Sequence, residues 1–276
     1  MSVWSYEGKR VVVAGCFSGM GEACARELVS LGAEVHGVDV RESPVKMASF
    51  RQVDLSDRVS IDAGVEAIGG PIDALFNCAG LPQTFPALDV MKVNFIGMRH
   101  WTERWLPKIR TGGAVASIAS TAAYRYAENQ GPAAELVATP DFDAAVAWVN
   151  SNPGPVGNGY GFSKQALILY TLGRAAQTAR QGVRMNVTLP SPTATPMMRD
   201  HFTRTTTETV LNVFAEPMGR QSTAAEQAYP LIFLNSDAAA FVNGHALMVD
   251  GGFTGGATVG AIDVPALLQR AVAAAE

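Results

Sequence analysis

Residues 11–21 read VVVAGCFSGMG, and this stretch decides the fold. Its valines form a short β-branched run, Gly15, Gly19 and Gly21 follow, and a helical pattern occupies residues 20–31. A strand, a glycine-rich turn and a helix N-terminus in this order present backbone N–H groups to a pyrophosphate. The stretch therefore predicts a dinucleotide-binding unit, and a tight turn that binds no ligand is the alternative.

The same alternation of strand and helix patterns continues through the chain. The runs are apolar on both faces, which is typical of parallel strands covered by helices on each side. This predicts an α/β fold, a Rossmann-like doubly wound parallel sheet in a single domain over residues 1–276. The further strand-like runs occupy residues 34–40, 74–77, 114–120, 183–189 and 245–250, and helical patterns occupy 160–181 and 223–235.

Composition excludes several classes of protein. Of 276 residues 48% are hydrophobic, which is enough for a large core. The net charge of −4 and the absence of a basic run argue against nucleic acid as a partner. No apolar run is long enough for a membrane span, and the start does not read as a signal peptide. The three cysteines, which have no metal-ligand spacing, fit a reducing compartment, so we expect a cytoplasmic protein without a metal site.

One region interrupts the alternation. Residues 125–159 separate the 114–120 strand from the 160–181 helix, where a short loop would suffice. Thr139-Pro140 followed by DFDAAVAWVN is typical of a helix start, and SNPGPVGNG is rich in turn residues. We expect a helical insert within the domain rather than a second domain, and we call residues 125–159 the insert.

Asp39 ends the second strand-like run. A carboxylate at this point accepts hydrogen bonds from ribose hydroxyls and repels a 2′-phosphate, which favours NAD over NADP. Arg41 lies close enough in sequence to weaken this preference. A solvated carboxylate at a strand end is the alternative.

Tyr160 and Lys164 are candidates for the chemistry. Their i,i+4 spacing on a predicted helix places phenol and ammonium on one face, and the ammonium favours the phenolate. Ser120 stands at a strand end, where parallel sheets bind ligands, and Asn94 lies in the helical stretch VMKVNFIGM. Taken alone, Ser120 and Asn94 are more often structural at such positions, and a structural role is also an alternative for Tyr160 and Lys164.

Together these motifs resemble the short-chain dehydrogenase/reductase family over essentially the whole chain, apart from the insert and the C-terminal tail. The insert and PSPTATPMM at 190–198 resemble its bacterial 3α-hydroxysteroid dehydrogenase/carbonyl reductase type. The departures from the family pattern are Ala14, Cys78, Ala119 and Ser191, and none removes a catalytic group. The motifs in order are Gly15/Gly19/Gly21, Asp54, Asn77-Cys78-Ala79-Gly80, Asn94, Ser120, Tyr160/Lys164 and Asp250-Gly251-Gly252.

The resemblance implies a role for each matching residue. Tyr160 would be the general acid/base, and Lys164 would lower its pKa and hydrogen-bond the nicotinamide ribose. Ser120 would orient the substrate oxygen, and Asn94 would hold a water that links Lys164 to solvent. The cofactor-binding residues would be Gly15, Ser18, Gly19, Met20, Gly21, Asp39, Asp54, Leu55, Asn77, Ala79, Gly80, Tyr160, Lys164, Pro190, Thr193 and Thr195.

The resemblance further implies an NAD-dependent oxidoreductase of apolar secondary alcohols and ketones, including hydroxysteroids or alicyclic alcohols. An aryl, terpene or diol substrate is the alternative, and a non-catalytic NAD-binding regulatory protein is a further one. Residues 191–222, here called the lid segment, carry methionine and aromatic side chains that suit a mobile lid or a core helix on the sheet. Because the family assembles through the helices that carry Asn94 and Tyr160, we expect a homo-oligomer, dimer or tetramer, whose interface the insert alters.

Overall fold

The computed structural model describes residues 2–128 and 130–273. Across these residues a seven-stranded sheet has the order β3-β2-β1-β4-β5-β6-β9, and all of its strands are parallel. A two-stranded parallel pair, β7-β8, lies apart from it. The strands are β1 Arg10–Ala14, β2 Glu34–Asp39, β3 Ser49–Gln52, β4 Ile72–Asn77, β5 Ile109–Ile118, β6 Arg184–Pro190, β7 Thr193–Ala194, β8 Ser222–Thr223 and β9 Ala246–Val249.

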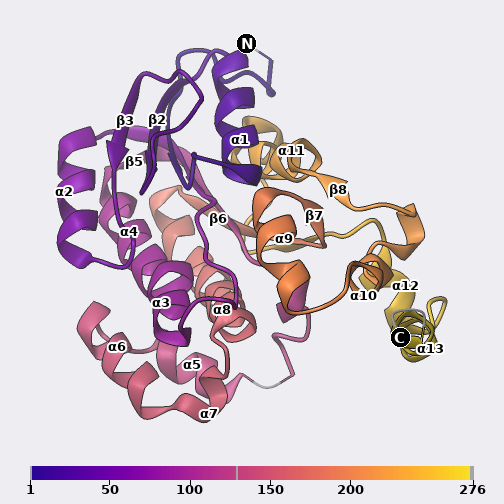
Figure 1. Ribbon diagram of the computed structural model, residues 1–276. Coiled ribbons are helices and arrows are strands. Elements are labelled where there is room, and N and C mark those ends of the chain that lie inside the picture. The colour runs from indigo at the N-terminus through magenta and orange to yellow at the C-terminus, as the bar shows by residue number, and fades with distance from the viewer. Residues whose placement is uncertain (1, 129, 274–276) are drawn as a thin grey trace.

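Helices cover both faces of the sheet (Figure 1). The α-helices are α1 Gly19–Ser30, α2 Arg58–Ile68, α3 Ala87–Met91, α4 Met98–Trp105, α5 Gly131–Val137, α6 Phe142–Ser151, α7 Pro153–Val156, α8 Tyr160–Thr178, α9 Pro196–Asp200, α10 Glu208–Val213, α11 Ala224–Asn235, α12 Phe253–Thr258 and α13 Val264–Ala273. A π-helical turn over Lys92–Gly97 joins α3 to α4, and short 3-10 turns include Thr121–Ala123 and Phe202–Arg204.

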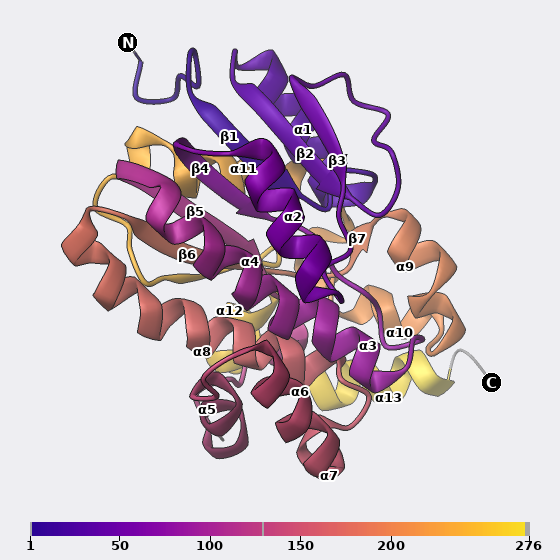
Figure 2. The same cartoon turned by 90° about the vertical axis from the view of Figure 1, so that its left-hand side faces the viewer.

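Two hydrophobic cores lie on opposite sides of the sheet because alternate residues of each strand face opposite ways. In β1, Val12 belongs to the core formed with α2, α4 and α8. Its neighbours Val11 and Val13 belong to the core formed with α1 and α11. Figure 2 shows α2 and α4 crossing the first of these faces next to each other. Because all seven strands are parallel, their carboxyl ends lie together along one end of the sheet, called the carboxyl edge below.

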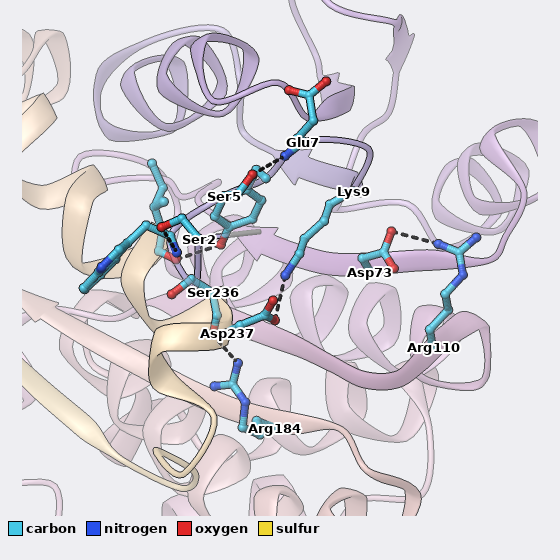
Figure 3. Close-up of polar contacts among 12 residues, drawn as sticks. Ser2, Ser5, Glu7, Lys9, Asp73, Arg110, Arg184, Ser236 and Asp237 are labelled. Carbon is cyan, nitrogen blue, oxygen red and sulfur yellow. Dashed lines mark hydrogen bonds and ion pairs between the residues drawn. The ribbon is translucent and has the colours of Figure 1, made fainter.

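Ion pairs and hydrogen bonds connect the chain around the amino ends of the strands (Figure 3). Lys9 pairs with Asp237 just after α11 at 2.7 Å, and Arg110 of β5 pairs with Asp73 of β4 at 2.8 Å. The Arg184 guanidinium donates to the carbonyls of Leu234 at 2.6 Å and Ser236 at 3.0 Å, which satisfies the end of α11. These contacts lie away from the carboxyl edge and are structural.

The predicted doubly wound parallel sheet is confirmed, and six of its strands fall within the predicted runs or extend them by a few residues. The seventh, β3, was not predicted. Its sequence SFRQ is short and half-exposed at the sheet edge, so it carries no apolar run. Pro230 lies inside α11 without ending it, as the 223–235 pattern predicted.

The insert is helical, as expected, and forms α5, α6 and α7 at the bottom of Figure 1. It packs against α8 and against the π-helical turn, so it lies over the two helical elements that carry Tyr160 and Asn94. Leu136, Phe142 and Val149 from the insert are buried in the same core as α4 and α8. The insert is therefore part of the domain.

No helix among residues 2–128 and 130–273 is both long enough and apolar enough to cross a bilayer.

Candidate active site

The turn between β1 and α1 is built so closely that it requires glycine. Gly15 has φ 87°, and a Cβ there would lie 2.4 Å from the Ala79 nitrogen. A Cβ on Gly21 would lie 2.0 Å from the Gly15 carbonyl oxygen. At Gly19 a Cβ would meet only the Thr195 side chain, at 3.4 Å. The first turn of α1 thus faces Thr195 across a narrow gap, which suits a phosphate at a helix N-terminus.

A groove of about 620 Å³ runs along the carboxyl edge from this turn past the end of β2. Its size fits a ligand-binding cavity. Its residues and the glycine cradle suit a dinucleotide, because they combine backbone N–H groups with a carboxylate at the far end. Of the predicted cofactor-binding residues, those that line it are Gly15, Ser18, Asp39, Asp54, Leu55, Ala79 and Gly80.

Asp39 lies in the groove beside a cation. Its carboxylate accepts hydrogen bonds from the backbone N–H groups of Phe17 at 3.0 Å and Arg41 at 3.2 Å. The Arg41 guanidinium stacks 3.9 Å from the centre of the Phe17 ring. The end of β2 therefore presents a negative group and a positive group to the same part of the groove.

Tyr160, Ser120 and Lys164 come together at the start of α8 and the end of β5. The Ser120 hydroxyl lies close enough to the Tyr160 phenol to favour its charged form. Lys164 Nζ donates to the Ile118 carbonyl at 2.9 Å and lies 5.9 Å from the centre of the Tyr160 ring. The i,i+4 spacing thus places the amine below the phenol, on the same face of α8.

Burial shifts the pKa values of both groups toward their neutral forms. Desolvation raises the pKa of the Tyr160 phenol, and the Ser120 hydroxyl opposes this shift. Burial also lowers the pKa of Lys164 to about 8, and the nearby Cys78 acts weakly in the opposite direction. The Lys164 amine donates to the Ile118 carbonyl rather than to the phenol. In the chain without a bound dinucleotide, the pKa of Tyr160 is thus raised, whereas the sequence predicted that it would be lowered.

Asn94 is fully buried in the π-helical turn. Its Oδ1 accepts from the Leu81 N–H at 2.6 Å, and its Nδ2 donates to the Leu81 carbonyl at 2.9 Å. A Cβ on Gly80 would lie 3.3 Å from Asn94 Oδ1 and 3.5 Å from Lys164 Nζ, so both side chains flank Gly80. Asn94 therefore belongs to the site and fixes the loop after β4.

Other predicted cofactor-binding residues are turned inward or face a second cavity. Asn77 is 1% exposed, and its amide donates to Thr102 and Ser117, so its side chain does not face the groove. The Thr193 hydroxyl bonds Ser191 and Ser222. Met20, Pro190, Thr193 and Thr195 line the second cavity instead.

This second cavity has a volume of about 970 Å³ and holds Ser120 and Tyr160 in its wall. Its opposite wall comes from the lid segment, through Met197, Met198 and Phe202. The ring of Phe202 meets Tyr160 edge-on, with 5.3 Å between centroids. The only Lys, Arg, His, Asp or Glu among its lining residues, within the described chain, is Asp263. The cavity therefore suits an uncharged, largely apolar molecule.

The C-terminal tail forms part of this cavity, which sequence reasoning missed. Residues 253–265 line it, and α13 packs against α10 of the lid segment. Val213, Phe253 and Ala271 form the centre of a small separate core there. The apolar spacing of Val264, Leu267, Leu268 and Ala271 was the available signal for this helix.

The lid segment consists of short helices and touches the rest of the chain across the groove. Gln83 Nε2 donates to Thr205 Oγ1 at 2.9 Å, and Thr84 Oγ1 lies 2.8 Å from His201 Nδ1. The rings of Phe85 and His201 are 5.5 Å apart. The segment is not a core helix on the sheet, which was the other interpretation.

Among the described residues, no three His, Cys, Asp or Glu side chains are grouped in a way that could hold a metal ion.

Comparison with protein families agrees with this geometry. Residues 9–133 match the family described as short chain dehydrogenase. Residues 145–254 match a related family described as enoyl-(acyl carrier protein) reductase. The gap between the two matches falls inside the insert.

Individual relatives match over most of their length. The coniferyl-alcohol dehydrogenase of Pseudomonas sp. (strain HR199 / DSM 7063) is 32% identical over 88% of this chain and 96% of its own. The 3-alpha-hydroxysteroid dehydrogenase/carbonyl reductase of Comamonas testosteroni is 31% identical over 88% of this chain and 95% of its own.

A solved structure is also similar. The 3-alpha-hydroxysteroid dehydrogenase from Pseudomonas sp. B-0831, complexed with NADH, superposes with a TM-score of 0.74 at 26% identity, over 88% of this chain and 95% of its own.

Proposed function

The chain belongs to the short-chain dehydrogenase/reductase family, and we propose that it is an NAD-dependent oxidoreductase that interconverts an apolar secondary alcohol and its ketone. The observation that carries this proposal is the contact of Tyr160 with Ser120 in the wall of a largely apolar cavity, above the buried Lys164. Hydroxysteroids and alicyclic alcohols are the substrates that we favour.

Tyr160 would act as the general acid/base. Its phenol would take the hydroxyl proton during oxidation and return it during reduction, while Ser120 holds the substrate oxygen by a hydrogen bond. A nicotinamide dinucleotide, when bound, supplies the hydride acceptor or donor. Lys164 would bind the nicotinamide ribose, and its amine, largely protonated at pH 7, would favour the phenolate. Asn94 would hold a water that passes the proton from Lys164 to solvent.

Asp39 supports NAD as the cofactor. Its carboxylate lies in the groove where an adenosine ribose would end, and it would repel a 2′-phosphate. Arg41 is stacked on Phe17 beside it and would attract one. We therefore expect a higher kcat/KM with NAD than with NADP, and we expect the carboxylate of Asp39 to be the source of the difference.

An aryl alcohol is the second candidate substrate. The relative from Pseudomonas sp. HR199 is named a coniferyl-alcohol dehydrogenase, and Phe202 next to Tyr160 would pack against an aromatic ring. Both candidates are uncharged, in agreement with the cavity.

The direct test is nicotinamide absorbance with a panel of steroidal, alicyclic and aryl alcohols, for the parent and for Tyr160→Phe. Loss of the phenol proton should lower kcat by about 10²–10⁴-fold. Binding of NADH, measured by fluorescence, should change little, because the ring remains. A Tyr160→Phe protein as active as the parent would refute the assignment, and NAD binding without turnover on any alcohol would favour a regulatory role.

The cofactor choice is tested separately by comparing NAD with NADP for the parent and for Asp39→Ser. The parent should use NAD with higher kcat/KM. Removing the carboxylate should raise kcat/KM for NADP about 10-fold or more, because Arg41 then meets the phosphate alone. A parent that turns over only with NADP would reverse the proposal.

We further propose a cytoplasmic homo-oligomer. The insert covers α4 and α8, since Arg99 beneath it is only 3% exposed. Tyr229 of α11 and Trp4, which packs against Phe233 of the same helix, have exposed aromatic side chains that a partner subunit could cover. Sedimentation at micromolar concentration should find a dimer or tetramer, and a monomer would contradict this.

A further inference from the structure

Asn158 lies in a turn whose two neighbouring positions favour glycine. It lies between Gly157, with φ 55°, and Gly159, with φ 82°. A Cβ on Gly159 would lie 2.7 Å from the Ala87 carbonyl oxygen. The turn ends the insert and leads directly into Tyr160, so the position of Asn158 relative to the phenol is fixed by backbone geometry.

One hydrogen bond sets the orientation of the Asn158 carboxamide. Its Oδ1 accepts from the Tyr160 backbone N–H at 3.1 Å, which satisfies one of the free N–H groups at the start of α8. One of the two lone pairs of the oxygen is therefore engaged. Its Nδ2 has no partner within residues 2–128 and 130–273, and the exposed side chain lines the same cavity as Tyr160 and Ser120.

Four other polar side chains of the cavity donate elsewhere, while Tyr124, Ser191 and Thr254, which also carry hydroxyl groups, line it as well. The Gln83 amide donates to Thr205. The Thr121 hydroxyl donates to the Pro190 carbonyl at 3.0 Å. Thr193 and Thr195 likewise bond carbonyl groups of their own segment. Asn158 Nδ2 thus differs from these donors, because it is free to bond a molecule in the cavity.

An unpaired donor disfavours a purely hydrocarbon ligand. Covering Nδ2 with an apolar group removes its water and gives no hydrogen bond in return, which costs free energy. A ligand oxygen at this point would replace the water. Ser120 and Tyr160 engage the reacting oxygen, so this oxygen must be a second one.

We propose that Asn158 is a specificity-determining residue that selects substrates with a second oxygen, namely diols and hydroxyketones, by donating a hydrogen bond to that oxygen. The inference rests on the proposed alcohol oxidoreductase activity and narrows its substrate class. The second oxygen is an acceptor, since Nδ2 can only donate.

The test uses a variant that keeps the turn and changes only the donor. Asn158→Asp retains an oxygen for the Tyr160 N–H, which a carboxylate at a helix N-terminus bonds well, and replaces Nδ2 by an acceptor. Asn158→Ser keeps a capping oxygen without a charge but is too short to reach the ligand. Thermal unfolding should show that both variants fold.

Turnover is measured with matched pairs: cyclohexanol against the 1,2-, 1,3- and 1,4-cyclohexanediols, and a monohydroxylated steroid against its dihydroxylated counterpart. The parent should prefer at least one diol. Both variants should lose about 10–100-fold in kcat/KM for that diol and stay within about 3-fold for the monoalcohol. The pH profile with the monoalcohol checks that Asn158→Asp leaves the titration of Tyr160 unchanged.

The outcomes separate the two proposals. A parent that prefers no diol, or variants that affect diol and monoalcohol equally, would overturn the role of Asn158 while the oxidoreductase stands. Turnover of none of these alcohols, nor of the aryl alcohols of the first panel, with either dinucleotide would overturn the proposed function itself, and the role of Asn158 would fall with it.

Discussion

The insert and the lid segment both interrupt the strand–helix alternation, yet different interactions hold them. The insert contributes Leu136, Phe142 and Val149 to the main core. It is also bound by the buried Arg99 of α4, whose guanidinium donates to the carbonyls of Thr139 at 3.1 Å and Asp141 at 2.8 Å. The insert is thus held by burial and by charge-assisted hydrogen bonds.

Arg220 of the lid segment pairs with Glu226 of α11 at a half-exposed site, and within residues 2–128 and 130–273 the lid segment contributes no side chain to the main core. Its buried Val213 belongs to a small core shared with the C-terminal tail, and contacts such as Thr84 with His201 join it to the groove. A long segment that interrupts the strand–helix alternation can be a fixed part of the fold or a segment that moves when a ligand binds. Its connections to the main core determine which of the two it is. We expect substitutions on the insert side to change stability, and substitutions on the lid side to change binding and release.

The largest effect on activity should come from substitution of Lys164. This residue is buried in α8, the helix against which α5 of the insert packs. Burial lowers the pKa of Lys164 from its ordinary 10.5 to about 8, so the folded state carries a penalty for the charged amine. Lys164→Met should lower kcat by about 100-fold or more. It should also stabilise the protein at pH 7, by up to about 3 kcal/mol, less the cost of leaving the Ile118 carbonyl unpaired.

The pH dependence of stability checks this interpretation. The penalty is complete below pH 8, falls between pH 8 and 10.5 as the unfolded chain also loses its proton, and is absent above that range. Urea unfolding at pH 7 and pH 10.5 should therefore show the Lys164→Met advantage only at pH 7. The exposed Lys46→Met serves as the control, and an equal advantage at both pH values would contradict the argument.

Arg99→Met should give the largest loss of stability. It removes the donors for several insert carbonyls, so the free energy of unfolding should fall by about 2–4 kcal/mol in urea denaturation. Arg104→Met on the same helix is the matched control. Its partners Asp62 and Glu66 are surface carboxylates, and the change should cost about 0–1 kcal/mol. Equal losses in the two variants would remove the distinction between the insert and an ordinary surface element.

The smallest effect should come from Thr84→Val, which removes the hydroxyl that contacts His201. Stopped-flow fluorescence should find NADH release accelerated by about 2–5-fold, with the unfolding midpoint unchanged. Thr203→Val is the control, because the Thr203 hydroxyl bonds Arg199 within the lid segment itself. A lower unfolding midpoint without faster release would place Thr84 in the scaffold instead.

Much of the fold could be predicted from sequence because buried parallel strands give continuous apolar runs. β3 escaped because an exposed edge strand has no such run. The helical nature of the insert could be predicted from Thr139-Pro140 and the turn residues at 151–159. Its attachment could not, since it depends on Arg99, which nothing in the sequence distinguishes from a surface arginine.

Some features of the candidate site could likewise be predicted from the sequence, and others could not. Ser120, Tyr160 and Lys164 meet because strand ends and i,i+4 spacing have fixed geometry. The inward turn of Asn77 toward Thr102 and Ser117 depends on which rotamer the core accommodates. The contribution of residues 253–265 to the cavity depends on where the chain returns after β9. Neither fact follows from local pattern.

Helix α9 lies between the groove and the second cavity and contributes residues to both. Pro196 and Asp200 of this helix line the groove, Met198 lines the second cavity, and Met197 lines both. Any displacement of this helix that one occupant requires therefore reshapes the compartment of the other. Thermodynamic reciprocity then demands that whatever factor the alcohol contributes to dinucleotide affinity, the dinucleotide contributes to alcohol affinity in equal measure. A dinucleotide and an alcohol that both contact this five-residue helix therefore cannot bind independently of each other.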